Sequence, residues 1–243
     1  MNEAAHIIVL TFAAGLCMPL GGVIARFEHI SPKWLETEVR HFAIAFGGGL
    51  LLGAVLLVLL PEGMARFGAS YGAVLVFVAG GFMFFAIERS MGLRRRESPQ
   101  LISMIIDYIP ESIALGGLVA ADPQLALVLA VVIGAQNLPE GFNTYRELVS
   151  SPAANSRDVL LFMLLLTPIG PAAGLSAHFL LDDSPRLLGA IMLIAAGGIL
   201  YLMFQDIAPQ SRLRRHWAPP LGAVAGFAIT MLTDIWLGHA LKG

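Results

Sequence analysis

The apolar residues of this chain are gathered into stretches long enough to cross a lipid bilayer, which takes about 20 residues in a helix. Hydrophobic residues make up 57% of the sequence and charged residues only 13%, a balance that no water-soluble core requires. We expect eight spans: 5–25, 42–60, 71–87, 101–121, 125–145, 159–181, 187–204 and 220–241. The sequence therefore predicts an all-α polytopic membrane protein whose one domain covers 1–243 and is embedded in the lipid bilayer.

Lysine and arginine are unevenly distributed among the connections between these spans, and cytoplasmic loops retain positive charge. The second, fourth and sixth connections hold only Arg66 and Arg186. The odd connections hold twelve of the fifteen basic residues: Arg26, Lys33, Arg40, Arg89, Arg94, Arg95, Arg96, Arg146, Arg157, Arg212, Arg214 and Arg215. We therefore expect the odd connections in the cytoplasm and both termini on the extracytoplasmic side, with the run Arg94–Arg96 as a topology anchor.

Several function classes are excluded by composition and motifs. A nucleic-acid binder would need a large basic excess, whereas the net charge here is −2. Cys17 is the only cysteine, which excludes an intrachain disulfide and a cysteine-rich metal site. The spans contain neither a nucleophile–base arrangement nor a phosphate-binding Gly-Lys motif, so we expect no enzyme activity and no cofactor.

Two neighbouring spans carry matched polar segments, and polar side chains inside a membrane are functional candidates because their insertion is costly. The segments share the pattern polar, x, x, Pro, Glu, small: Asp107-Tyr-Ile-Pro110-Glu111-Ser112 and Gln136-Asn137-Leu-Pro139-Glu140-Gly141. Asp107 and Glu111 are four residues apart, as are Gln136 and Glu140. Each pair therefore projects from a single helical face.

The four side chains fall in one slab of the membrane. At 1.5 Å per residue they lie about 7 to 15 Å from the cytoplasmic ends of their helices, so Asp107 can face Glu140 and Glu111 can face Gln136. Each proline removes a backbone hydrogen bond, so each helix could kink and expose a carbonyl oxygen. Three carboxylates packed together must hold protons, a cation or both. The alternative is a purely structural polar network.

These features resemble the ZIP (Zrt/Irt-like) family of divalent metal transporters. The family's motif on spans four and five is His-Asn-x-Pro-Glu-Gly or a Gln-started variant, which 136–141 matches closely. The first motif departs from it, with Asp107 for His, Tyr108 for Asn and Ser112 for Gly. Two further segments are similar to family segments on spans two and seven: Leu59-Leu60-Pro61-Glu62 and Asp206-Ile-Ala-Pro209.

The resemblance implies a metal site whose ligands are Asp107, Glu111, Gln136 and Glu140, with the divalent metal as transported substrate. All four are oxygen donors, whereas Zn²⁺ favours nitrogen and sulfur, so Mn²⁺ or Fe²⁺ is plausible cargo beside Zn²⁺. The family's second metal site would use Tyr108, Asn137 and a Glu on span six, but Thr167 stands in the Glu position. A two-metal centre is therefore doubtful.

Other polar residues leave two interpretations open. Glu62 could line an entrance or be a boundary charge, and Asn143 and Thr144 could line the site or pack. Resemblance places Gln205 and Asp206 on an exit pathway. The many glycines could serve close helix contacts or a homodimer interface.

The resemblance further implies that spans one, four, five and six carry the cargo against spans two, three, seven and eight. We expect transport towards the cytoplasm across the inner membrane of a bacterium. Two alternatives remain: a proton-coupled carrier of a small organic solute, and a transport-inactive ZIP-like metal sensor.

Overall fold

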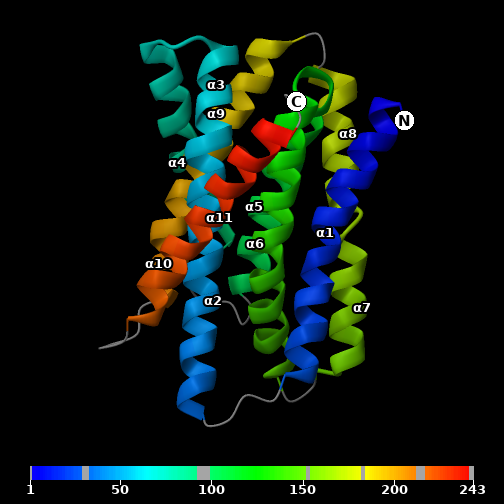
Figure 1. Ribbon diagram of the computed structural model, residues 1–243, viewed down its shortest axis with the longest axis vertical. Coiled ribbons are helices and arrows are strands. Elements are labelled where there is room, and N and C mark those ends of the chain that lie inside the picture. Colours follow the sequence, from blue (N-terminus) through cyan, green and yellow to red (C-terminus); the bar gives the residue numbers. More distant parts are fainter. Residues whose placement is uncertain are drawn as a thin grey trace.

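The computed structural model describes residues 2–28, 33–91, 99–151, 154–181, 184–211 and 217–240, so the run Arg94–Arg96 lies outside the described residues. Eight helical spans in this part of the chain are long and apolar enough to cross a membrane, which confirms the predicted all-α class. Span one is α1 (Glu3–Phe27) and span eight is α11 (Ala218–Ala240). α1 begins and α11 ends at the same end of the bundle (Figure 1), as an even number of spans requires.

The remaining spans are continuous or interrupted by a short turn. Three are single helices: α4 (Tyr71–Met91), α5 (Pro99–Ala121) and α6 (Pro123–Val149). Span two consists of α2 (Lys33–Gly53), η1 (Ala54–Leu59) and α3 (Leu60–Phe67). Span six consists of α7 (Ser156–Leu166) and α8 (Ile169–Leu181), and span seven of α9 (Pro185–Leu202), η3 (Met203–Ile207) and α10 (Ala208–Ser211).

Prolines account for the interruptions. The turns η1 and η3 are π-helical, and each ends two residues before a proline, Pro61 or Pro209. A proline ring clashes with the carbonyl four residues earlier, and the wider π turn makes room for it. Span six breaks at Pro168, but α5 and α6 continue through Pro110 and Pro139 without a break.

The helices pack as two groups, which agrees with the division that the family resemblance implies. The first group, here called the inner group, contains α1, α5, α6, α7 and α8, and the second, the outer group, contains α2–α3, α4, α9–α10 and α11. Within each group the backbones approach closely at glycines. A Cβ atom on Gly21 or Gly141 would lie 2.0 or 2.1 Å from a carbonyl oxygen across the α1–α6 contact, and Gly49 and Gly226 meet the same obstacle between α2 and α11.

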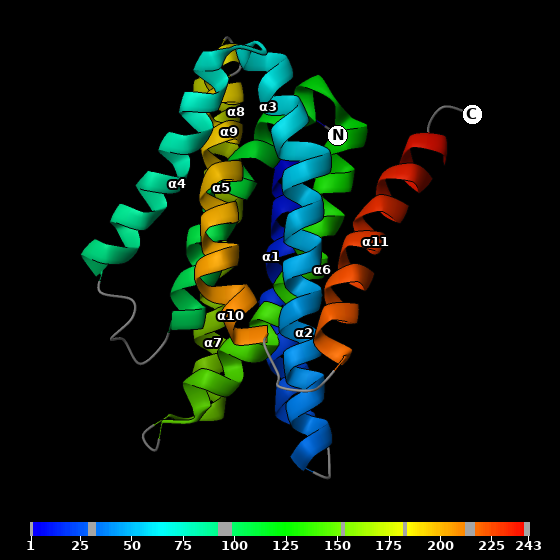
Figure 2. The same ribbon diagram turned by 90° about the vertical axis from the view of Figure 1, so that its left-hand side faces the viewer.

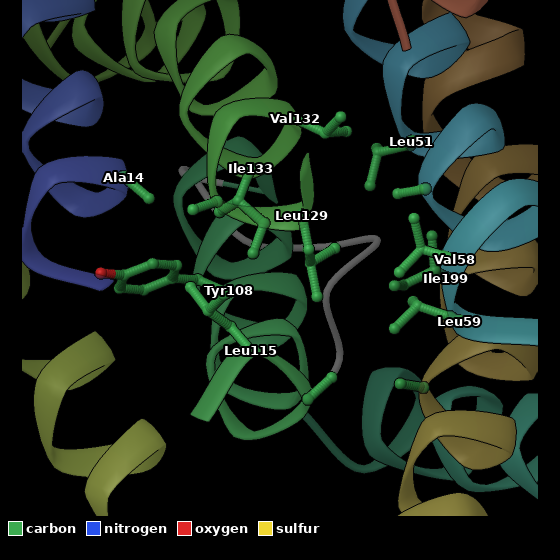
Figure 3. Close-up of a cluster of buried hydrophobic side chains, with 14 of the residues drawn as sticks. Ala14, Leu51, Val58, Leu59, Tyr108, Leu115, Leu129, Val132, Ile133 and Ile199 are labelled. Atoms are coloured by element: carbon green, nitrogen blue, oxygen red, sulfur yellow. The ribbon is translucent and has the colours of Figure 1, made fainter. Parts of the chain in front are cut away.

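Contacts between the two groups are looser. The described glycines at this interface face side chains and not backbone: a Cβ atom on Gly47 would lie 3.5 Å from the Pro139 ring, and one on Gly117 would meet the Leu188 side chain. Apolar side chains from α6 also face those of span two across the interface, as the close-up in Figure 3 shows for Leu129 and Val58. The interface is therefore a surface of interdigitated side chains, which can shift more easily than a backbone contact.

The outer surface of the bundle is apolar, as a lipid-facing surface must be. α4 and α11 lie on opposite sides of the molecule (Figure 2). Leu75 and Phe82 on α4 are 70% and 68% exposed, and Val224 and Trp236 on α11 are 65% and 69% exposed. Such side chains would be unfavourable in water, but a bilayer accommodates them.

Candidate functional site

Glu111 of α5 and Gln136 of α6 form a buried hydrogen bond at the centre of the inner group. The Gln136 Nε2 atom donates to the Glu111 Oε1 atom at 2.6 Å, and neither side chain has any exposed surface. This is the facing pair that the four-residue spacing predicts. It fixes the two motifs at a common depth.

Asp107 and Glu140 lie one helical turn closer to the expected cytoplasmic end. The two carboxyl groups are close enough to interact electrostatically, and both line one cavity between the inner and outer groups. Asp107 is only 2% exposed. Other residues lining the cavity are Ala43, Ile44, Gly47, Gly48, Gln100, Ser103, Met104, Pro139, Asn143, Asp206, Ile207 and Gln210.

Five buried oxygen atoms on the Glu111–Gln136 pair and on the residues that line the cavity have no hydrogen-bond partner. They are Asp107 Oδ1, Glu111 Oε2, Gln136 Oε1, Glu140 Oε2 and Asn143 Oδ1. A buried polar atom left unpaired costs about 1–3 kcal/mol, so such a group of acceptors requires protons, water or a cation. Hard divalent cations take oxygen ligands of this kind.

The carboxylates do not converge on one point in this structure. Among the described residues, no three His, Cys, Asp or Glu side chains lie close enough together to hold a metal ion. A cation at this position would be held by the carboxylates together with amide oxygens or water, or after a small movement of the side chains.

Tyr108 and Asn137 are directed towards α1 instead of the carboxylates. The Tyr108 hydroxyl donates to the Thr11 carbonyl oxygen at 2.8 Å, and Figure 3 shows the ring pointing to α1. The Asn137 amide donates to the Ala14 carbonyl oxygen at 3.0 Å. The Thr167 hydroxyl is buried and donates to the Leu164 carbonyl oxygen. Tyr108 and Asn137 therefore join α5 and α6 to α1, whereas the Thr167 hydroxyl is bonded within its own span.

Of the predicted pathway residues, Asp206 lines the cavity, whereas Gln205 and Glu62 do not. Asp206 lines the cavity and interacts electrostatically with Asp107. Gln205, its neighbour, donates from Nε2 to Glu88 Oε1 of α4 at 3.0 Å. Glu62 pairs with Arg66 at 3.0 Å on the same helical turn, at the other end of the bundle from the cavity.

Sequence reasoning left Asn143 open and did not single out Gln100, Ser103 and Gln210. The helical spacing could have indicated Asn143, Gln100 and Ser103. Gln100 and Ser103 share a helical face with Asp107, and Asn143 shares one with Glu140. Gln210 comes from span seven, and no spacing rule connects it with spans four and five. Thr144, also left open, contacts the Met104 sulfur at 3.9 Å and does not line the cavity.

No protein-family model matches the chain, but the chain is similar to proteins that are named zinc transporters. The chain is 24% identical to the zinc transporter ZupT of Chlorobium phaeovibrioides, over 98% of this chain and 100% of that protein. It is 32% identical to the zinc transporter GufA of Myxococcus xanthus, over 57% of this chain and 55% of that protein. Identity to the zinc transporter ZupT of Akkermansia muciniphila is 25%, over 96% and 99% of the two chains.

Proposed function

We propose that the chain is a divergent ZIP-like divalent metal transporter, as its similarity to proteins named zinc transporters supports. It moves Zn²⁺-, Mn²⁺- or Fe²⁺-type cations towards the cytoplasm through a site formed by Asp107, Glu111, Gln136 and Glu140. The observation that carries this proposal is the set of unpaired, buried oxygen atoms that these four side chains contribute. Protons would occupy the carboxylates when the site is empty, so metal and protons would exchange.

The ligand chemistry argues for a broader selectivity than that of a dedicated zinc site. Zn²⁺ is bound most tightly by imidazole and thiolate ligands, whereas carboxylate and amide oxygens suit Mn²⁺ and other hard cations. Asp107 supplies an oxygen where the family's usual residue is a histidine. We therefore expect Mn²⁺ to compete effectively with Zn²⁺.

The two-group packing supports a mechanism in which the inner group moves relative to the outer group. All four proposed ligands lie on α5 and α6, in the inner group, and the cavity beside them lies at the interface. Backbone contacts at glycines would keep each group rigid, and the side-chain interface would allow displacement between them. The cation would then travel with its ligands.

Uptake by proteoliposomes tests the proposal. Initial rates for Mn²⁺, Fe²⁺, Zn²⁺ and Cd²⁺ are compared among the wild type, Glu111→Gln and Glu140→Gln. Glu111→Gln removes the charge and leaves a side chain of the same shape, and Asp158→Asn, at the exposed start of α7, is the matched control. We expect both site variants to lose most of their metal uptake and the control to keep it.

Other outcomes favour the alternatives. Metal uptake that is indifferent to both substitutions would contradict the proposed site. Metal binding without uptake would favour a transport-inactive sensor, and metal-independent uptake of an organic solute would favour the proton-coupled carrier.

A further inference from the structure

A largely apolar groove lies between α1 and α7 on the surface of the inner group. The two helices lie side by side (Figure 1) and are in contact. The contact is tight, because a Cβ atom on Gly22 of α1 would lie 2.9 Å from the Leu160 side chain of α7. The groove has a volume of about 480 Å³, and its lining residues are Leu16, Pro19, Leu20, Val23, Arg26, Arg157, Leu160, Leu161 and Leu164.

Each helix contributes one face to the groove. The lining residues recur at three- or four-residue spacing from Leu16 to Arg26 on α1 and from Arg157 to Leu164 on α7. Residues at that spacing lie on one side of a helix. Leu20 and Leu161 are 52% and 58% exposed, so the groove opens towards the surrounding lipid. Both faces are apolar along their length and carry an arginine at the expected cytoplasmic end.

The length of the groove matches the thickness of one leaflet of a bilayer. Leu16 and Arg26 are ten residues apart on α1, which corresponds to about 15 Å along the helix. The hydrocarbon core of a bilayer is about 30 Å thick, so one leaflet accounts for about half of it. The groove therefore follows the path of an acyl chain from the cytoplasmic surface towards the centre of the membrane.

The two arginines give the cytoplasmic end of the groove a positive charge. Arg26 is in the last turn of α1, Arg157 is in the first turn of α7, and both are exposed. Of the neighbouring acidic residues, Glu28 pairs with Arg146 of α6 at 3.4 Å, and Asp158 does not line the groove. Guanidinium groups bind phosphate through parallel hydrogen bonds, and basic pockets between spans on the cytoplasmic side bind anionic lipid headgroups. The groove thus matches both parts of an anionic phospholipid.

We propose that the groove between α1 and α7 is a binding site for an anionic phospholipid of the cytoplasmic leaflet. One acyl chain lies along the leucines, and Arg26 and Arg157 hold the phosphate group. The bound lipid ties α7 to α1, the helix whose Thr11 and Ala14 carbonyl oxygens accept hydrogen bonds from the two motifs. The lipid therefore stabilises the inner group, whichever cation the protein carries.

Native mass spectrometry of the purified full-length protein tests the proposal, because it counts the lipids and the chains in each complex. The protein is titrated with phosphatidylglycerol, which is anionic, and with phosphatidylcholine, which has no net charge. We expect the wild type to bind phosphatidylglycerol in preference. Replacing Arg26 and Arg157 by glutamine should weaken this binding about fivefold for each arginine and about thirtyfold for the two together.

A matched control removes the same charge elsewhere on the same side of the membrane. Arg40→Gln with Arg89→Gln changes two exposed arginines that do not line the groove, so the binding of phosphatidylglycerol should persist.

A second variant tests the apolar part of the site and keeps both arginines. Val23→Trp fills the groove and should displace the acyl chain, whereas Val78→Trp, at a 43% exposed position of α4 outside the groove, should not. Phosphatidylglycerol should also raise the melting temperature of the wild type more than that of Val23→Trp, since a ligand stabilises only the fold that binds it.

The proposal requires both the charge and the groove, so several results would overturn it. Equal binding of the two lipids by the wild type is one. Another is unchanged binding of phosphatidylglycerol either in the double arginine variant or, if that variant does not fold, in Val23→Trp. A wild type that binds neither lipid but forms a dimer, which Val23→Trp disrupts, would assign the groove to a second copy of the chain. None of these results would touch the proposed transport site, which lies on α5 and α6.

Discussion

At the residue scale, different positions within each motif have different roles. Asp107, Glu111, Gln136 and Glu140 supply buried oxygens to the space between α5 and α6 and beside it, whereas Tyr108 and Asn137 follow the first residue of each motif and bond to α1. Adjacent residues on a helix project about 100° apart, which explains the division. The motif therefore positions its own helices while it supplies ligands.

This division gives a prediction for Tyr108. Tyr108→Phe removes one buried hydrogen bond, so the free energy of unfolding should fall by about 0.5–1.5 kcal/mol. The affinity for Mn²⁺ should not change, because the hydroxyl contacts the Thr11 carbonyl and not the carboxylates. Denaturant unfolding in detergent and a titration of the purified protein with Mn²⁺ measure the two quantities. A large loss of Mn²⁺ affinity at unchanged stability would show that Tyr108 is a ligand.

The helical spacing of polar residues was enough to predict the Glu111–Gln136 pair. It was not enough to predict the orientation of Tyr108, which depends on two glycines of other helices. A Cβ atom at Gly15 or Gly170 would overlap the Tyr108 hydroxyl, so the ring fits only because both positions lack a side chain. Such an arrangement is a tertiary property that a single motif does not contain.

At the element scale, small residues fix how closely the helices pack. Gly21 on α1 faces the backbone of α6, and a Cβ atom there would lie 2.0 Å from the Leu138 carbonyl oxygen. In a membrane, where lipid is as apolar as the helix surface, such close packing is a main source of helix association. The eight spans were predictable from apolar runs, but the π turns at η1 and η3 were not, although Pro61 and Pro209 are their cause.

Gly21→Ala should destabilise the fold. The added methyl group forces α1 and α6 apart at a cost of about 1–3 kcal/mol, which exceeds the gain of up to about 1 kcal/mol from replacing a helical Gly by Ala. Gly81→Ala is the control, because a Cβ atom there would lie 3.5 Å from the Gly197 carbonyl oxygen, an ordinary contact. Thermal unfolding in detergent compares the two variants. Equal melting temperatures would contradict the proposed role of the α1–α6 contact.

At the scale of the whole molecule, the arrangement of the spans relative to the membrane follows from the charges in the loops. The structure places the start of α1 and the end of α11 at the same end of the bundle (Figure 1), and the side of the membrane on which they lie is a prediction from the distribution of Lys and Arg. The separation into two groups could be anticipated only through the family resemblance. Its physical basis, glycine contacts within the groups and side-chain contacts between them, depends on three-dimensional packing.

Single-cysteine labelling tests the orientation. In a Cys17→Ala background, Tyr71→Cys lies at the exposed first residue of α4 and Ser150→Cys in the exposed connection after α6. A membrane-impermeant maleimide added to intact cells should label the first and spare the second. The reverse pattern would invert the predicted topology and, with it, the expected direction of transport.

The central claim is that a divalent cation binds among the carboxylate and amide oxygens of α5 and α6. Anomalous diffraction from crystals grown with Mn²⁺ tests it most directly, because the metal position is then located independently of any phase bias. We predict an anomalous peak among Asp107, Glu111, Gln136 and Glu140, and its loss in Glu111→Gln. A peak found only elsewhere, such as beside the Glu3–His178 pair at the opposite end of the bundle, would contradict the account.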